Sequence, residues 1–376
     1  MTKKVYYWSP FTSPVATVQS VVNSVISLQK FGKGKFEPCI INAVGEWNTL
    51  KKNLDEKIEF VDLSSNNALF ERNKSKYGFL KSRFYYWYIF IKSFIPLLKI
   101  LKKNPPEYLI IHLITSLPLI LLIFFNFETK FILRISGYPR MNFLRKLLWR
   151  LAFKKIYLIT CPTKNTLNYI KSLNLTDSSK IKLLYDPVIN IKEIKEKLNE
   201  KIEIDDFFLS AGRLTKQKNF MFLCEAFKEL VKKNNQIKLL IAGNGEENTK
   251  LKKFIKKNNL DKNIILLGYV KNIYPYFKNC KGFILTSLWE DPGFVILEAA
   301  YSRSLVLSSN SWPGPIELIK DNFNGFIFKN NDKENFLKKF KDFTNNENSQ
   351  TLKLNNLKMC RNFTFFNHYK NLNKLL

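Results

Sequence analysis

Two carboxylates lie eight positions apart in the stretch TSLWEDPGFVILEAA, residues 286–300. Glu290 precedes a Pro-Gly pair, and Glu298 lies in the apolar run that follows it. We expect a helix over 294–302, because Pro-Gly breaks the preceding structure, and its free N–H groups suit an anion such as phosphate. The two acids would then accept hydrogen bonds from hydroxyl groups on either side of the anion. The alternative is that both acids flank an exposed helix.

Two cations follow an apolar run in the stretch SAGRLTKQKNF, residues 210–220. Arg213 and Lys218 at the carboxyl end of a strand suit a diphosphate, because charge-assisted contacts to phosphate oxygens are strong. In IAGNGEE (241–247), Gly243 permits close backbone approach to a ligand. Each signal has a plain alternative: two more cations among 61 Lys and Arg residues, and an ordinary turn between strand and helix.

The elements that must position these residues alternate between strand and helix patterns. In the first half, helical patterns such as 15–30 and 142–153 separate apolar runs that predict strands at 4–9, 36–42, 57–62, 108–113, 130–136, 155–160 and 180–185. The second half predicts strands at 207–211, 237–242, 263–268, 281–286 and 304–308. Because the apolar runs are continuous, we expect both faces of each strand to be covered, as in parallel sheets.

A charged stretch at 189–206, after the YDPV turn, is the expected domain boundary. The predicted division is an N-terminal domain over 1–190, a C-terminal domain over 191–345, and a helical segment over 346–376 that crosses back to the first domain. Both domains should be doubly wound α/β units. Such units bind ligands at the carboxyl ends of their strands, so we expect a cleft between two facing domains.

The chain of 376 residues carries a formal charge of +30. Three explanations are open: the codon usage of an AT-rich genome, an anionic membrane surface, or a nucleic-acid partner. The chain shows no helix-turn-helix, zinc or RNA-binding signature, and a nucleic-acid partner would leave the two acids unexplained, so we expect none. Five scattered cysteines without a CxxC pair, only two histidines and no apolar run in MTKKVYYWSP favour a cytoplasmic protein without disulfides, zinc or a secretory signal.

Two apolar stretches bear on membranes. Residues 108–125 reach the lower limit for a transmembrane helix, but a buried strand followed by an apolar core helix explains them equally well. Residues 79–103 interleave Lys and Arg with Phe, Tyr and Trp, which is typical of a helix lying in a membrane interface. The alternative for this second stretch is a core helix with a Lys-tipped outer face.

Together these stretches resemble the family-4 retaining glycosyltransferases, which have the GT-B architecture of two facing Rossmann-like domains. The resemblance rests on SAGRL with Lys218, IAGNGEE, LLGYV (266–270), the spacing of Glu290 and Glu298, DNFNGFIF (321–328) and YDPV. It implies that Arg213 and Lys218 neutralise the diphosphate of a nucleotide-sugar donor. It further implies that Glu298 binds the ribose hydroxyls and that Glu290 contacts the transferred sugar.

The resemblance also assigns the remaining donor contacts. Backbone groups around Gly293, Phe294 and Val295 would meet the sugar and the diphosphate. The nucleobase would lie near Gly243, Tyr269 and Val270.

The sequence departs from the family pattern in three places. Gly-Phe follows the first Glu directly in the common form, whereas here Asp291 intervenes and would take part of the role of Glu290. The N-terminal glycine-rich loop is replaced by SPFTSPVAT (9–17), where hydroxyl residues such as Ser13 would approach the substrates. The His that many relatives carry after the strand matching 130–136 is absent, so the residues expected to line the acceptor side are Arg134, Ser136 and Gly137. His112 belongs to an earlier strand and is expected to be structural.

The expected activity is retaining transfer of a sugar from a nucleotide sugar to a saccharide acceptor, in surface polysaccharide, lipopolysaccharide or capsule synthesis. The basic and aromatic stretch favours a lipid-linked acceptor and peripheral attachment to the inner face of the cytoplasmic membrane. We expect neither a metal nor a cofactor, because two cations and a helix end already face the diphosphate. A nucleotide-sugar epimerase of the same architecture, and a basic nucleic-acid-binding protein, are the alternatives.

Overall fold

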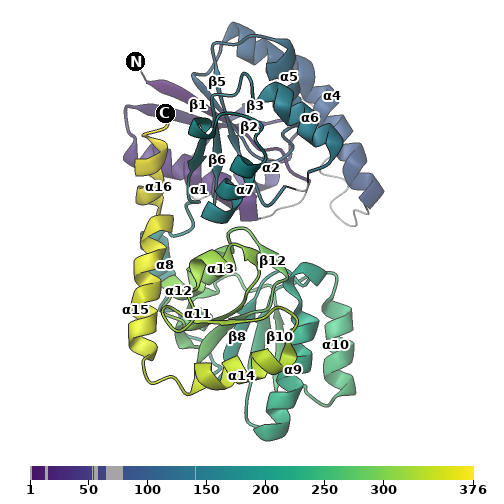
Figure 1. The fold of residues 1–376 in the computed structure, drawn as a ribbon, viewed down its shortest axis with the longest axis vertical. Coiled ribbons are helices and arrows are strands. Elements are labelled where there is room, and N and C mark those ends of the chain that lie inside the picture. The colour runs from purple at the N-terminus through teal and green to yellow at the C-terminus, as the bar shows by residue number, and fades with distance from the viewer. Residues whose placement is uncertain (1, 13–15, 53, 55–57, 65–78, 140) are drawn as a thin grey trace. The chain divides into compact units, whose positions relative to one another are not determined.

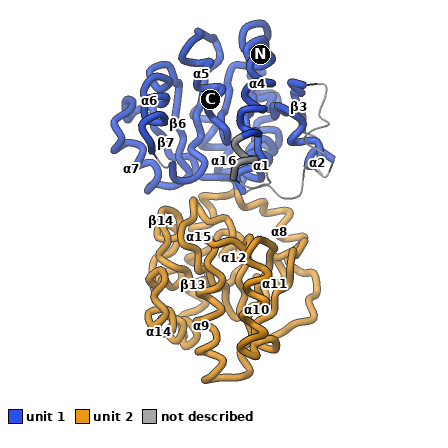
Figure 2. Tube along the Cα trace, turned by 90° about the vertical axis from the view of Figure 1, so that its right-hand side faces the viewer, with its two compact units in different colours: residues 1–187, 365–376 blue, residues 188–364 orange. Residues whose placement is uncertain are grey.

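The computed structural model describes every residue except 1, 13–15, 53, 55–57, 65–78 and 140, and at 79–83 it describes the backbone alone. The chain forms two compact units. Unit 1 comprises residues 1–187 and 365–376, and unit 2 comprises residues 188–364 (Figures 1 and 2). The predicted α/β fold of two Rossmann-like units is confirmed.

Unit 1 is built on a seven-stranded parallel sheet in the order β3-β2-β1-β4-β5-β6-β7. Its strands are β1 (Lys3–Trp8), β2 (Phe36–Asn42), β3 (Glu59–Asp62), β4 (Tyr108–Ile111), β5 (Lys130–Arg134), β6 (Leu158–Cys161) and β7 (Ile181–Leu183). Its helices are α1 (Ala16–Phe31), α2 (Asn48–Lys51), α4 (Phe79–Lys103), α5 (Ser116–Phe124), α6 (Phe143–Ala152), α7 (Lys164–Ser172) and α16 (Phe365–Leu372), with a 3-10 turn at Ser178–Lys180.

Both faces of this sheet are covered, as the continuous apolar runs predict. Alternate residues of one strand pack on opposite sides: Tyr108 and Ile110 of β4 join the core with α1, while Leu109 and Ile111 join the core with α4 to α7. Period-two alternation therefore decides which side chain enters which of the two cores.

The two apolar stretches of unit 1 form different structures. Within residues 108–125 lie the buried strand β4 and then the core helix α5, which is the alternative to a transmembrane helix. Among the described residues, one helical segment, Phe84–Lys103 of α4, is long and apolar enough to cross a membrane, and 28% of its most apolar 18-residue window is buried. Ile89, Leu97 and Leu101 of this helix pack into the core of unit 1.

Unit 2 repeats the design with a six-stranded parallel sheet in the order β10-β9-β8-β11-β13-β15. Its strands are β8 (Phe208–Ala211), β9 (Leu239–Ala242), β10 (Ile264–Gly268), β11 (Gly282–Leu285), β13 (Val306–Ser309) and β15 (Phe326–Phe328), and β12 (Trp289–Glu290) pairs separately with β14 (Trp312–Pro313). Its helices are α8 (Ile191–Lys197), α9 (Phe220–Lys233), α10 (Asn248–Lys257), α11 (Tyr274–Asn279), α12 (Phe294–Tyr301), α13 (Pro315–Leu318), α14 (Lys333–Thr344) and α15 (Ser349–Cys360), with 3-10 turns at Lys216–Lys218 and Arg361–Phe363.

The chain passes between the units twice, after Pro187 and before Phe365. The first passage lies at the YDPV turn. The C-terminal helices are divided between the units, because α15 belongs to unit 2 and α16 to unit 1. At the second passage, the backbone N–H groups of Val188 and Ile189 both donate to the carbonyl of Phe363, at 2.9 Å.

Candidate functional site in unit 2

The strand order of unit 2 reverses between β8 and β11, which lie side by side although β9, β10 and three α-helices separate them in the chain. Segments that leave the carboxyl ends of two such strands diverge and leave room for a ligand. The segment after β8 holds Arg213 and Lys218, and the segment after β11 holds Glu290. The topology therefore brings the predicted cations and the first predicted acid to one edge of the sheet.

Lys218 and Glu290 contact each other directly. The Nζ of Lys218 forms an ion pair with Oε1 of Glu290, and the two side chains are 14% and 10% exposed. Ser287 Oγ donates to the same carboxylate oxygen at 2.6 Å. Thr286 Oγ1 donates to the backbone carbonyl of Lys218 at 3.0 Å, so a second side chain also links the segments after β8 and β11.

Glycines of the neighbouring segment shape the backbone around Arg213. Gly212 has φ +152° and Gly243 has φ +138°. A Cβ on Gly243 would lie 1.9 Å from the carbonyl oxygen of Gly212. Only glycine allows the two backbones to approach this closely, so the glycine-rich stretch after β9 fixes the path of the segment that carries Arg213. The Arg213 side chain is exposed and has no hydrogen bond or ion pair with any residue that the structure describes.

Helix α12 begins beside this ion pair. Gly293 is its N-cap with φ +98°, and a Cβ there would lie 3.6 Å from Cβ of Glu290. The first helical residues are Phe294 and Val295, whose N–H groups stand at the positive end of the helix. The expected helix start, directly after the Pro-Gly pair, is observed.

Glu298 lies one turn into α12, as expected from the spacing. Burial, together with the nearby carboxylate of Glu193, raises the pKa of its carboxyl group to about 7, while Lys218 acts in the opposite direction. Burial and the charges of Glu298 and Glu193 likewise raise the pKa of Tyr274. Glu298 is thus electrostatically coupled to Lys218 and to two residues on other elements of unit 2.

Sequence reasoning missed Glu193 and Tyr274. Glu193 lies on α8, inside the charged stretch interpreted as a domain boundary, and its carboxylate accepts from Asn190 and Lys197. Tyr274 opens the short helix α11. No spacing rule connects either residue with α12, because the sheet topology alone brings them near Glu298.

The residues assigned to the nucleobase occupy the same edge. Gly243 follows β9, and its N–H donates to the carbonyl of Gly268 at 2.6 Å. Tyr269, directly after β10, is 77% exposed, and Val270 is partly buried. Asp291 is partly buried next to Glu290.

The residues assigned to the acceptor side belong to unit 1. Ser13 lies outside the described residues. Ser136 is partly buried, and Gly137 has φ +84° with open space where a Cβ would stand. Arg134 is only 5% exposed, and its guanidinium forms an ion pair with Asp186, which is 3% exposed on the side chain.

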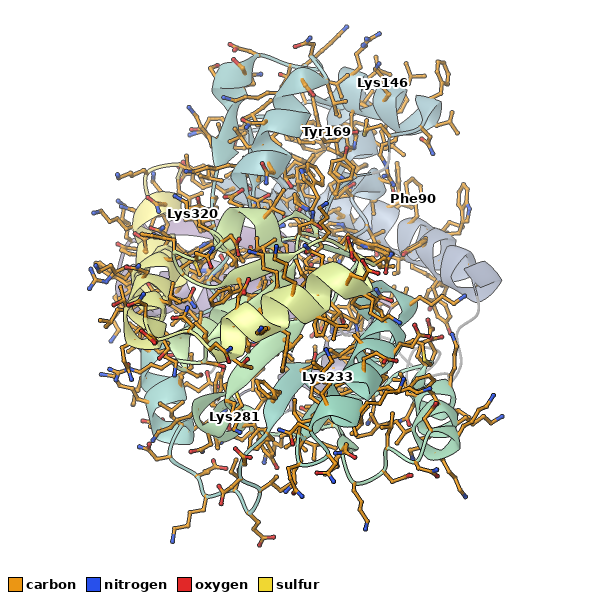
Figure 3. All side chains as sticks on the ribbon, turned by 60° about the horizontal axis from the view of Figure 1, so that its bottom comes forward. Phe90, Lys146, Tyr169, Lys233, Lys281 and Lys320 are labelled. Atoms are coloured by element: carbon orange, nitrogen blue, oxygen red, sulfur yellow. The ribbon has the colours of Figure 1, made fainter. Side chains whose placement is uncertain are left out.

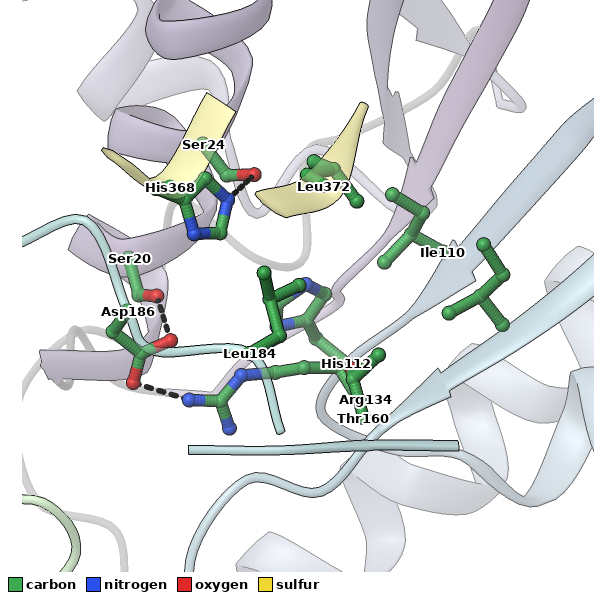
Figure 4. A pocket seen from close by; sticks show the side chains of 11 residues that line it. Ser20, Ser24, Ile110, His112, Arg134, Thr160, Leu184, Asp186, His368 and Leu372 are labelled. Carbon is green, nitrogen blue, oxygen red and sulfur yellow. Dashed lines mark hydrogen bonds and ion pairs between the residues drawn. The ribbon is translucent and has the colours of Figure 1, made fainter. Parts of the chain in front are cut away.

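Arg134 lines a small cavity of about 10 Å³ in unit 1, whose lining mixes polar and apolar side chains (Figure 4). Ser20 Oγ donates to Asp186 at 2.8 Å, and His368 contacts Ser24 Oγ at 2.8 Å (Figure 4). His112 is buried in the same cluster, and burial holds its pKa well below the ordinary value, with Arg134 and His368 lowering it further. His112 is therefore neutral and enclosed, which suits the structural role expected of it.

The described residues contain no group of three or more His, Cys, Asp and Glu side chains with the geometry to hold a metal ion. The five cysteines are free and buried. The predicted polar groups at the carboxyl edge of unit 2 are instead two cations (Arg213 and Lys218), two carboxylates (Glu290 and Glu298) and the amino end of α12. This set matches an anion flanked by hydroxyl groups.

Comparison with known proteins shows what this chain is similar to. Residues 190–358 match the family model described as glycosyl transferases group 1. An uncharacterised glycosyltransferase of Methanocaldococcus jannaschii is 32% identical over 251 residues, covering 61% of this chain and 62% of the relative. The N-acetylgalactosamine-N,N'-diacetylbacillosaminyl-diphospho-undecaprenol 4-alpha-N-acetylgalactosaminyltransferase of Campylobacter jejuni is 31% identical over 194 residues, covering 50% and 52%. The chain thus spans only about half to three fifths of the length of these two relatives.

Among solved structures, TarM superposes with a TM-score of 0.77 and 14% identity over 100% of this chain and 99% of that chain. A mutant of Staphylococcus aureus TarM has also been solved in complex with UDP, and it gives a TM-score of 0.75. At this identity the likeness establishes the fold, which is the GT-B arrangement of two Rossmann-like units. The match to the glycosyl transferases group 1 model lies within residues 190–358, so unit 2 of this chain is similar to the members of that family.

Proposed function

We propose that the chain transfers a sugar from a nucleoside diphosphate sugar to a saccharide acceptor. The observation that carries the proposal is the convergence of Arg213, Lys218, Glu290 and the amino end of α12 at the switch point of unit 2. The cations and the helix end take the diphosphate. Glu298 accepts hydrogen bonds from the ribose hydroxyls, and Glu290 accepts them from the sugar. TarM bound to UDP supports a nucleotide donor.

The charges fit a reaction in which the leaving group becomes more negative. The bond between the anomeric carbon and the diphosphate oxygen breaks, and an acceptor oxygen bonds to the same carbon. The proton of the acceptor hydroxyl passes to the departing phosphate oxygen. Arg213, Lys218 and the helix end stabilise the developing charge more strongly than the ground state, which lowers the barrier.

We further propose that the anomeric configuration is retained by front-face substitution, as the resemblance to retaining enzymes implies. Glu290 is engaged by Lys218 and Ser287, which suits a sugar-binding role better than that of a free nucleophile. The proposal also includes independence of divalent metal, so that activity should survive EDTA. Product analysis by NMR tests the configuration directly.

The acceptor that we propose is a lipid-linked saccharide at the inner face of the cytoplasmic membrane, in surface glycan synthesis. The Campylobacter relative is named for a diphospho-undecaprenol acceptor, which supports this class. The surface of unit 1 supports it independently. Exposed apolar side chains are concentrated on α4 and α6: Phe84, Trp87, Ile91, Ile95, Phe143, Leu144 and Leu147 are each at least 45% exposed.

The same two helices also carry exposed cations. We call the surface formed by the exposed apolar and cationic side chains of α4 and α6 the α4–α6 face. Lys92 of α4 and Arg145, Lys146 and Arg150 of α6 are exposed, and Figure 3 labels Lys146 on this side of unit 1. Apolar side chains mixed with cations suit the interface of an anionic bilayer. Because Ile89, Leu97 and Leu101 of α4 pack into the core, we propose that the helix lies on the membrane rather than across it.

A thermal-shift assay with UDP, GDP and a short DNA duplex tests the function. Stabilisation by one nucleoside diphosphate, lost in Glu298→Gln, is the expected result. Stabilisation by the duplex alone would overturn the proposal in favour of a nucleic-acid-binding protein. Incubation with nucleotide sugars separates transfer from epimerisation, since an epimerase would return an altered nucleotide sugar without acceptor.

A further inference from the structure

A second concave region lies at the opposite, amino edge of the unit 2 sheet. It is a groove of about 780 Å³, within the range of small-molecule sites. Phe208 at the start of β8 and Lys281 just before β11 line it, together with the last turn of α9, α14 and the start of α15. Figure 3 labels Lys233 and Lys281 at this edge. The groove shares none of its lining residues with the proposed donor site.

The groove combines an apolar floor with a cationic rim. Leu230 of α9 and Leu337 of α14 are partly exposed on the floor, and Phe340 lies beneath them. The floor is closed by tight packing, because a Cβ on Gly282 would lie 2.1 Å from the ring of Phe343. A ligand with an apolar part would therefore meet side chains that already form the edge of the core.

The rim is more basic than the chain as a whole. Five lysines line the groove (Lys233, Lys281, Lys338, Lys341 and Lys353), against the single acid Asp206. The whole chain has 61 basic and 31 acidic residues, so general lysine richness does not account for this ratio. Lys281 is paired with Asp206, while the other four lysines have no ion pair with any residue in the described part of the chain.

Helix dipoles explain only part of this charge. Lys233 and Lys341 lie in the last turns of α9 and α14, where a cation complements the helix end. Lys338 lies in the middle of α14 and Lys353 in the first half of α15, so neither compensates a helix carboxyl end. These two lysines are left for an external anion.

We propose that this groove binds a single-chain amphiphile with a phosphate head group. The phosphate lies on Lys338 and Lys353, and the alkyl chain lies along Leu230 and Leu337. A phosphate monoester carries more than one negative charge near neutral pH, and lysines bind it as point charges. The apolar floor distinguishes this ligand from free phosphate, which would leave the floor uncovered.

The test is calorimetric titration of the full chain with decyl phosphate below its micelle concentration. Inorganic phosphate and decyl trimethylammonium are titrated alongside to separate the head-group charge from the chain. We expect binding of decyl phosphate only, weakened at least tenfold in Lys338→Glu/Lys353→Glu. The matched control, Lys333→Glu/Lys358→Glu, makes the same charge change on the same two helices outside the groove and should change affinity less than twofold.

Lys338→Glu alone, at an exposed position, provides a second readout if the double variant does not fold, with an expected loss of at least threefold. Equal binding by the groove and control double variants would overturn the proposal, because the amphiphile would then bind elsewhere. Equal binding of inorganic phosphate would reduce the groove to a plain anion site, and equal binding of the cationic amphiphile would indicate detergent-like association. Either result would also overturn the proposal that the groove binds an amphiphile with a phosphate head group.

Discussion

Lys218 and Glu290 form an ion pair, and this pairing has a consequence for the proposed function. If the site takes a nucleotide sugar as proposed, the diphosphate would draw Lys218 toward its oxygens and free Glu290 for the sugar hydroxyls. The partly buried ion pair thus holds both groups at the switch point before the donor arrives. Arg213, exposed and without a partner among the described residues, is available for a phosphate at once.

Removing Arg213 or Lys218 should therefore lower the turnover number kcat more than it weakens binding of the donor. We expect Arg213→Ala and Lys218→Ala each to reduce kcat by about 100-fold or more, the scale of a lost oxyanion contact. The control is Lys216→Ala, which removes an exposed charge two residues from Lys218 and should stay within about twofold of wild type. Steady-state kinetics with the active nucleotide sugar provide the measurement. Near-normal kcat in both variants would contradict the assignment of the diphosphate.

Glu298 gives a prediction on pH. Burial raises its pKa to about 7, so the folded protein holds this proton more tightly than the unfolded chain does. The resulting stability is present at acidic pH and is lost as pH rises through about 7. Glu298→Gln has no carboxyl group at this position, so it does not lose stability in this way. Between pH 5 and pH 8.5 the Tm of the wild type should therefore fall by about 2–4 °C relative to the Tm of the variant, which corresponds to an effect of about 1 kcal/mol.

Calorimetric Tm values of both proteins across this pH range provide the test. Glu334→Gln, at an exposed position on α14, is the matched control for the loss of one carboxyl group. A difference between wild type and Glu298→Gln that stays constant with pH would show that the Glu298 carboxyl group does not titrate in this range.

At this scale the sequence predicts the polar residues that follow strands, but not their long-range partners. Arg213 and Lys218 are predictable because they follow a strand, and Glu290 because of its spacing from Glu298 before an expected helix, whereas the shared sheet edge is seen only in the structure. The burial of Arg134 was not predictable, since its partner Asp186 is 52 residues away in the chain. Glu193 was not predictable either, because its electrostatic coupling to Glu298 depends on where α8 packs.

At the scale of elements, continuous apolar runs predict the parallel strands well, and the structure shows why. Tyr108 to Ile111 send alternate side chains into two separate cores, so every position must be apolar. Very short strands are not predictable from the sequence, because only pairing with another strand forms them. The two-residue strand β12 exists because Trp289 and Glu290 pair with β14, and no periodicity can arise over two residues.

The glycine after β9 gives a prediction at this scale. Gly243→Ala should lower the free energy of unfolding by about 3 kcal/mol or more, because strain at positive φ adds to a backbone clash at Gly212. Gly268→Ala in the same unit is the control. Its φ is +71° and a Cβ would lie 3.6 Å from its nearest neighbour, so we expect about 1–2 kcal/mol. Urea unfolding measures both, and equal losses would show that the close approach is not strained.

At the scale of the molecule, the chain has a formal charge of +30, and its cations lie on several surfaces that differ in their neighbouring side chains. Cations at the carboxyl edge of unit 2 face the proposed donor, those around the amino-edge groove surround an apolar floor, and those of the α4–α6 face stand among exposed aromatics. Composition alone left codon usage, membrane and nucleic acid open. Where exposed apolar side chains accompany the cations, the membrane is favoured over nucleic acid, because a duplex offers no partner for Phe143 or Leu144.

The α4–α6 face therefore gives the last prediction. The full chain should sediment with vesicles that contain anionic lipid, and much less with neutral vesicles, because the lysines and arginines of this face act only on a negative surface. Leu144→Glu/Leu147→Glu should weaken sedimentation about tenfold or more, since each acid replaces an exposed apolar contact and repels the anionic surface. Leu354→Glu, at a 56% exposed position on α15 of unit 2, should have little effect. Equal sedimentation of both variants would place the attachment elsewhere, and negligible binding of the wild type to both kinds of vesicle would contradict membrane attachment itself.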